Sequence, residues 1–177
     1  TIQELRGNVR VFARVRPFLS GDGASDDEKQ QPSVVPKADG VSLKLRLKGD
    51  EKKEYDFSFD DVFKPDISQE AVFAEVSEFV QSALDGYNVC LFAYGQTGSG
   101  KTHTMGTNAS ADVTLDEKTG IIPRMVSDMY ARIEQEGTSW KRDITVSFLE
   151  IHNDDIRDLL DQVRGLGPEH RVRVALR

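Results

Sequence analysis

Residues Gly95 to Thr102 carry the clearest chemistry in this sequence. They read GQTGSGKT and fit the pattern G-x-x-x-x-G-K-[ST] at every defined position. Glycines let a backbone turn tightly enough for successive N–H groups to converge on phosphate oxygens. The pattern therefore predicts a loop that binds the phosphates of a nucleotide.

The positions of this loop have separate expected roles. A helix that begins near Gly100 would direct its positive end toward the phosphates. Lys101 is expected to reach the β- and γ-phosphates as a point charge. The Thr102 hydroxyl is expected to bind Mg²⁺, which keeps most of its waters. The residues predicted to hold the phosphates are Gly95, Gln96, Thr97, Gly98, Ser99, Gly100, Lys101 and Thr102.

The plain alternative is a glycine-rich turn with an incidental lysine. With glycine at its usual ~7%, chance gives this pattern in roughly one chain of this length in a few hundred. The context argues against chance, because the apolar run VCLFAY at 89–94 leads directly into the loop. Such a run is typical of a strand buried on both faces of a sheet. Cys90 within it is expected to be a core residue rather than a nucleophile.

Hydrophobic patterns predict the strands that surround the loop. Alternation predicts strands at 9–15 and from 144 to 151, and a hairpin whose arms are 41–48 and 55–59. Residues 20–36, with the acidic run 26–28, are expected to form an exposed loop.

Helical spacing predicts the helices. One apolar stripe runs from Val72 to Leu84, with Asp66 or Ser68 as the N-cap and Gly86 as the stop. A second helix is expected to open at Pro123 and end at Gly137, with a buried face made of Ile122, Met125, Met129 and Ile133. Residues 106–120 are expected to be an exposed loop, and 155–160 a short helix.

Strands and helices intermix, and a buried strand precedes the glycine loop, so the predicted fold class is α/β. The 177 residues suffice for one domain with a core. No apolar run reaches the roughly 18 residues of a membrane span. The net charge of −7 argues against a nucleic-acid-binding surface over the whole chain. A single cysteine allows no disulfide framework, which predicts a reducing, intracellular location.

Other catalytic classes find no support. Three histidines, His103, His152 and His170, and one cysteine are too scattered for a zinc site. No nucleophile-elbow spacing surrounds any serine.

Residues 88–105 resemble the nucleotide-binding segment of kinesin motor domains nearly residue for residue. Three further segments are similar to that family: RVRP at 14–17, the stretch 55–63 with its F-x-F-D-x-V-F pattern, and 148–160 as a strand and helix. The resemblance covers Leu5 to about Asp161. It implies a P-loop NTPase-type motor fold with a central mixed sheet flanked by helices.

The resemblance also implies the ligand and more of its site. The implied ligand is ATP or ADP with Mg²⁺. The residues implied to flank the adenine are Arg14, Arg16 and Pro17, and His103 is implied to stack on its other side. Without this resemblance, the two arginines would be interpreted as surface charges at the end of a strand. The histidine would be interpreted as a helix residue whose hydrogen bonds are satisfied locally.

The opening residues 4–12 resemble the neck–motor junction of C-terminal-motor kinesins, the minus-end-directed class. This implies that 1–6 end a coiled-coil neck that dimerises, and that 7–177 are part of the motor domain. It implies microtubules as the partner, with no nucleic acid, and a place on the cytoplasmic cytoskeleton, with the spindle as one candidate.

Two later family motifs do not occur in these 177 residues. N-x-x-S-S-R-S-H and D-L-A-G-x-E supply the groups that position the attacking water and hold the Mg²⁺ shell. The resemblance thus implies an incomplete motor fold, whose phosphate-loop strand lacks its neighbours. The tail 162–177, with four arginines against Glu169 (+4 − 1 = +3), resembles the family poorly. It reads as a divergent microtubule-facing loop or as a non-native ending.

Three functions are left open. The first is the ATP-binding part of a microtubule motor that couples hydrolysis to movement. The second is a truncated module that binds nucleotide or a partner without hydrolysis. The third, an unrelated P-loop kinase or GTPase, is disfavoured because no guanine-reading N-K-x-D occurs.

Overall fold

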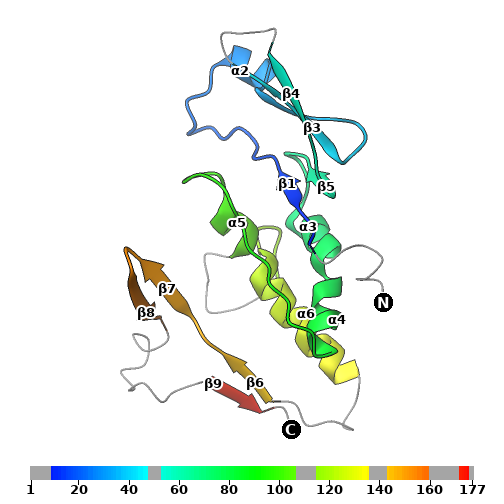
Figure 1. Cartoon of the computed structure of the whole chain (residues 1–177), viewed down its shortest axis with the longest axis vertical. Coiled ribbons are helices and arrows are strands. Elements are labelled where there is room, and N and C mark those ends of the chain that lie inside the picture. Colours follow the sequence, from blue (N-terminus) through cyan, green and yellow to red (C-terminus); the bar gives the residue numbers. More distant parts are fainter. Residues whose placement is uncertain (1–8, 48–52, 107–114, 136–142, 160–171, 176–177) are drawn as a thin grey trace. The chain divides into compact units, whose positions relative to one another are not determined.

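The computed structural model describes residues 9–47, 53–106, 115–135, 143–159 and 172–175 (Figure 1). The chain divides into two compact units, Thr1–Met129 and Tyr130–Arg177. Both contain strands, and the helices α2 to α5 lie in the first unit, in agreement with the predicted α/β class. No helix within the described ranges is long and apolar enough to cross a membrane.

A short parallel pair of strands lies beside the core of the first unit. β1 (Phe12–Arg14) pairs with β5 (Asp61–Phe63), and the rings of Phe12 and Phe63 stack with their centroids 5.8 Å apart. Phe63 is buried together with Val72, Val76 and Ile121. The predicted strand at 9–15 is therefore confirmed in its central part and is shorter at both ends.

The predicted hairpin is confirmed and carries a third strand. β3 (Ser42–Arg46) and β4 (Glu54–Ser58) are antiparallel, and β2 (Val34–Pro36) joins the other edge of β3. The residues 48–52, which include the end of the first predicted arm, lie outside the described residues.

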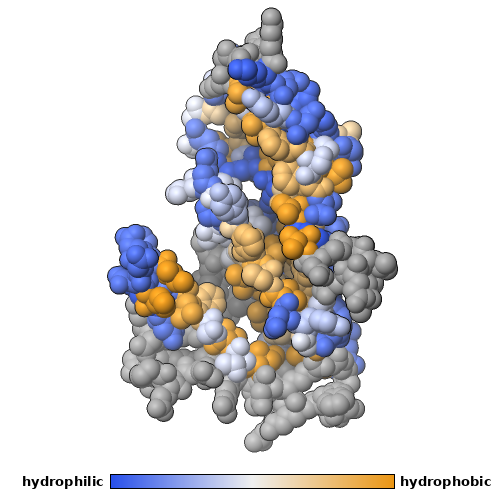
Figure 2. All heavy atoms as spheres, viewed as in Figure 1, coloured by the Kyte–Doolittle hydropathy of each residue, from blue (hydrophilic) through white to orange (hydrophobic). Residues whose placement is uncertain are grey.

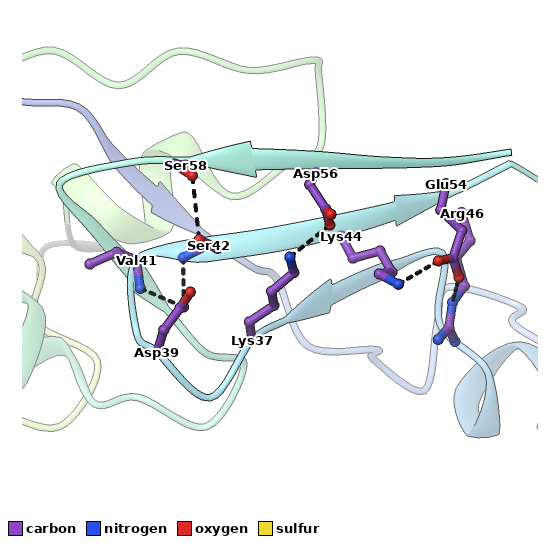
Figure 3. Close-up of polar contacts among 9 residues, drawn as sticks. All are labelled: Lys37, Asp39, Val41, Ser42, Lys44, Arg46, Glu54, Asp56 and Ser58. Atoms are coloured by element: carbon purple, nitrogen blue, oxygen red, sulfur yellow. Dashed lines mark hydrogen bonds and ion pairs between the residues drawn. The ribbon is translucent and has the colours of Figure 1, made fainter.

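Charged side chains pair along one face of this sheet (Figure 3). Glu54 accepts hydrogen bonds from Lys44 and from Nε of Arg46, and Lys37 Nζ lies 2.9 Å from Asp56 Oδ1. The bond from Lys44 is the main cause that lowers the pKa of the Glu54 carboxyl, and the bond from Lys37 does the same for Asp56. These basic side chains are thus paired within the sheet.

The segment 20–36, predicted to be an exposed loop, is not buried, but the loop assignment is wrong. The segment contains α2 (Asp26–Gln30) as well as β2. Ser25 caps α2 through a reciprocal pair of bonds, in which the Glu28 N–H donates to Ser25 Oγ and the Ser25 N–H donates to Glu28 Oε2. The helix has no buried residue, so it leaves no apolar period in the sequence.

The helix predicted from 66 to 84 is present as two pieces. α3 spans Gln69–Val76 and α4 spans Glu78–Leu84. Ser68, not Asp66, is the N-cap, because its Oγ accepts the Ala71 N–H at 3.1 Å. At the break, Ser77 Oγ donates to the Ala74 carbonyl, and such back-bonding competes with regular helix geometry. Gly86 follows α4 with φ +95°, as the predicted stop requires.

The second predicted helix is α6 (Ile121–Gln135), which begins two residues before Pro123. Ile121 is the buried side chain at its start, 4% exposed, whereas Ile122 is exposed and its prediction is wrong. Met125, Met129 and Ile133 are partly buried, as expected. The predicted stop, Gly137, lies outside the described residues, as does most of the loop predicted at 106–120.

The apolar run 89–94 is not a strand in this structure. None of the sheets formed by the described residues contains it. Leu91 packs against the core, but Phe92 is 78% and Tyr94 96% exposed, and Cys90 is exposed too. The prediction of burial on both faces, and of Cys90 in the core, is therefore wrong here. An extended segment becomes a strand only where neighbouring backbone supplies hydrogen-bond partners.

Among its described residues, the second unit contains two antiparallel strand pairs. β6 (Asp143–Val146) pairs with β9 (Val172–Ala175), so part of the divergent tail is a strand. β7 (Leu149–His152) pairs with β8 (Asp155–Asp158), and the short helix predicted at 155–160 is wrong. Asn153 and Asp154 both have positive φ, 49° and 67°, which is the conformation of a tight two-residue hairpin turn. The predicted strand 144–151 is split between β6 and β7.

The β7–β8 hairpin exposes apolar side chains, visible as orange among blue at the left of Figure 2. Leu149, Ile151 and Ile156 are exposed, with Ile151 at 72%.

Candidate nucleotide-binding site

The glycine loop folds as a tight turn ahead of α5 (Lys101–Met105). Gly98 and Gly100 have φ of +80° and +98°, a conformation that side chains disfavour. A Cβ on Gly95 would lie 2.6 Å from Ser99 Oγ, and the Ser99 N–H donates to the Gln96 carbonyl at 3.1 Å. Positive φ thus favours glycine at 98 and 100, and a side chain at 95 would displace the Ser99 hydroxyl. A backbone phosphate cradle needs such tight turns.

Lys101 lies over this loop. Its Nζ donates to the carbonyls of Gly95 at 2.8 Å and Gln96 at 2.9 Å. Phosphate oxygens are stronger partners for an ammonium group than neutral carbonyls are. The arrangement fits a phosphate chain bound at the loop, because the ammonium group of Lys101 already lies within reach of that position. The side chain of Thr102, the expected Mg²⁺ ligand, is exposed in the first turn of α5.

Arg16 and Pro17 follow β1 and are exposed. The Arg16 Cδ lies 4.0 Å from the point that a Cβ on Gly100 would occupy, so this side chain borders the loop. Its guanidinium pairs with Asp22 at 2.8 Å. The Leu19 N–H bond, and then the bond from Arg16, lower the pKa of the Asp22 carboxyl.

Arg14 points toward the helix that follows the loop. Its Nη1 donates to Gln69 Oε1 at 2.6 Å and to Thr104 Oγ1 at 3.0 Å. The guanidinium is partly buried, and that burial lowers its pKa. The structure therefore brings Arg14 against α5 through two side chains that the sequence patterns did not single out.

His103 is exposed on α5, between Thr102 and Thr104. Partial desolvation, and then the charge of Arg14, lower the pKa of its imidazole below the ordinary value of 6.5. The neutral ring is the form favoured at physiological pH.

This shift predicts a pH dependence of stability. As the pH falls below about 6.5, the unfolded chain takes up the His103 proton before the folded chain does, so stability decreases until the lower folded pKa is passed. We expect the protein to lose more stability between pH 7.5 and 5.5 than a His103→Asn variant does. Urea midpoints at both pH values measure the difference, and equal losses would contradict the shift.

Sequence reasoning missed Gln69 and Thr104 as site residues. Gln69 belongs to no functional motif in the sequence, yet it is 4% exposed and bonded to three other segments. No local sequence pattern identifies Gln69, because its hydrogen-bond partners lie 34 to 55 residues away in sequence. Across the described ranges, no group of three or more His, Cys, Asp or Glu side chains could hold a metal ion.

Comparison with known proteins places the chain in a family. The family described as "Microtubule binding" matches residues 1–160. Carboxy-terminal kinesin 2 of Xenopus laevis is 48% identical over 171 residues, which cover 90% of this chain and 25% of that relative.

Two solved structures agree with this match. The motor domain of the Kar3-like kinesin from Ashbya gossypii has a TM-score of 0.69 at 33% identity, over 97% of this chain and 55% of that one. The C-terminal motor domain of Kar3 from Candida glabrata has a TM-score of 0.67 at 36% identity, over 87% of this chain and 47% of that one. The chain thus spans about half the length of these motor domains and about a quarter of the Xenopus relative. It belongs to the kinesin family, as part of a motor domain similar to those of the C-terminal-motor kinesins.

Proposed function

We propose that this chain is the nucleotide-binding part of an ATP-driven microtubule motor. The observation that carries the proposal is the position of Lys101, whose ammonium lies over the loop from Gly95 to Gly100. The positive φ of Gly98 and Gly100 supports it, because a phosphate-binding loop needs such backbone turns.

In this proposal different residues bind the phosphates and the metal. The backbone of 95–100 and the ammonium of Lys101 hold the phosphate chain, and the Thr102 hydroxyl is a ligand of Mg²⁺. Bound Mg-ATP supplies the γ-phosphoryl group whose transfer to water drives a motor. Lys101 would exchange its two neutral carbonyl partners for charged phosphate oxygens, which are stronger acceptors for an ammonium group.

The base is proposed to lie beside β1 and α5. Arg14, Arg16 and Pro17 flank it on one side, and His103 stacks on the other. The exposed, neutral ring of His103 supports stacking, since an aromatic face is then free of charge. The pair between Arg16 and Asp22 holds that guanidinium next to the loop.

The partners follow from the family. The chain is proposed to act in a minus-end-directed motor on cytoplasmic microtubules, including those of the spindle. We further propose that residues 1–6, which lie outside the described residues, end a coiled-coil neck that dimerises the motor, and that 7–177 belong to the motor domain. The carboxy-terminal kinesin among its relatives supports this class.

A second function is proposed for these 177 residues when they act without the rest of a motor domain. The motifs N-x-x-S-S-R-S-H and D-L-A-G-x-E do not occur in the sequence, and both water positioning and the Mg²⁺ shell depend on such groups. We therefore propose that the 177 residues bind nucleotide without hydrolysing it at motor rates.

Equilibrium binding and turnover test both functions. A fluorescent ATP analogue is expected to bind the chain saturably, more tightly with Mg²⁺ than with EDTA, and to be displaced by ATP more readily than by GTP. Added microtubules are expected to leave ATP turnover near background. Absence of binding would refute the nucleotide site, and much tighter binding of GTP would revive the GTPase hypothesis. Microtubule-stimulated turnover would refute the non-hydrolysing module.

A further inference from the structure

Gln69 is a buried amide at the first turn of α3, and its side chain lies next to the proposed nucleotide site. It is 4% exposed. Its Oε1 accepts the Arg14 Nη1–H at 2.6 Å. Its Nε2 donates to the backbone carbonyls of His103 and, at 3.3 Å, of Lys118.

The three partners require an amide in one orientation. A guanidinium can only donate hydrogen bonds, and a backbone carbonyl can only accept them. An amide oxygen facing Arg14 and an amide nitrogen facing two carbonyls satisfy all three groups together. A carboxylate would repel the carbonyls of His103 and Lys118, and an apolar side chain would leave every partner without its bond.

These bonds tie α5 to elements far from it in sequence. The helix has five residues, too few to hold its place by intrinsic helix stability. Gln69 holds the backbone of His103, and Arg14 reaches from β1 to Thr104 of the same helix. The bond to Lys118 adds the segment that leads into α6. One side chain therefore connects β1, α3, α5 and the segment before α6.

We propose that Gln69 is a positioning residue for the base end of the nucleotide site. The inference rests on the proposed function, in which Arg14 and His103 lie at the base. Gln69 bonds to both of these residues, whereas Lys101 bonds to the loop carbonyls of Gly95 and Gln96. Loss of the amide should therefore weaken recognition of the base more than phosphate binding, because Lys101 of the same helix is also held by its two bonds to the loop.

The test compares two ligands that share a phosphate chain. Gln69→Met keeps the length of the side chain and removes its polar atoms. We expect Mg-ATP to bind this variant about tenfold more weakly, as loss of one well-placed contact would give. The affinity for inorganic tripolyphosphate with Mg²⁺ should stay within about twofold of the unmodified chain. Gln30→Met, which changes an exposed glutamine on α2, is the matched control and should alter neither affinity.

Two further variants cover the case in which Gln69→Met does not fold. Gln69→Glu keeps an acceptor for Arg14, and Thr104→Val removes the other acceptor of that guanidinium without altering Gln69. Both should lower the preference for ATP over tripolyphosphate, by less than Gln69→Met does. Circular dichroism and urea midpoints establish which variants are folded.

The outcomes separate the two proposals. If folded Gln69 variants keep the preference for ATP over tripolyphosphate, or lose affinity for both ligands equally, the positioning role is overturned. If the unmodified chain binds neither ligand, the proposed function fails, and that result needs no variant. A selective loss for ATP supports the positioning role.

Discussion

Lys101→Ala is expected to weaken the binding of Mg-ATP by roughly 100-fold, or about 2.7 kcal/mol. The ammonium lies 2.8 and 2.9 Å from two carbonyls of the glycine loop, where it would meet the phosphates. A charged hydrogen bond to a phosphate contributes more than a neutral bond, and the alanine supplies none. Isothermal titration with ATP and Mg²⁺ measures the change.

Lys64→Ala is the matched control for charge. Lys64 is an exposed lysine between β5 and α3, and its removal changes the net charge by the same amount. It should leave the affinity unchanged. Equal ATP affinities for the Lys101→Ala variant and the unmodified chain would show that the lysine is incidental, and the glycine-rich turn would then be the better interpretation.

Gly120→Ala is expected to destabilise the fold by roughly 2–4 kcal/mol. A Cβ at this position would clash with the Gly106 carbonyl oxygen and would lie 2.8 Å from both the Gly106 nitrogen and the carbonyl carbon of Met105. All three are backbone atoms at the end of α5, and backbone cannot rotate away as a side chain can. Since the free energy of unfolding of a domain is about 5–15 kcal/mol, this loss would leave the protein only marginally stable. Urea unfolding at constant pH measures it.

Gly21→Ala is the control for that substitution. A Cβ there would meet nothing within 4 Å. Its effect should stay within about 0.5 kcal/mol. An unchanged midpoint for Gly120→Ala would mean that the close approach of Gly106 and Gly120 does not persist in solution.

Features set by neighbouring residues could be predicted from the sequence. The glycine loop and the cap of α3 at Ser68 each depend on residues within a few positions of one another, and the β3–β4 hairpin joins two strands that are consecutive in the chain. The errors also have local causes. α2 buries no side chain and so shows no apolar period. The segment predicted as a short helix at 155–160 contains β8 instead, because the tight turn at Asn153 and Asp154 folds it back onto β7.

The remaining features depend on contacts between distant segments. The network around Gln69 joins residues up to 55 positions apart, and no local pattern encodes such a meeting. The break at Ser77 divides an unbroken apolar stripe, which predicts one helix. The exposure of Cys90 follows from which backbone lies beside it, and sequence composition does not specify a neighbour.

The extended run 89–94 has a thermodynamic consequence for the ligand. It leads directly into Gly95 and has no ladder of hydrogen bonds within the described part of the chain. Any ordering of this run that ligand binding requires would cost conformational entropy and would lower the affinity of the ligand. Linkage makes the effect reciprocal. Backbone that pairs with 89–94 would tighten nucleotide binding, and bound nucleotide would strengthen that pairing by the same factor.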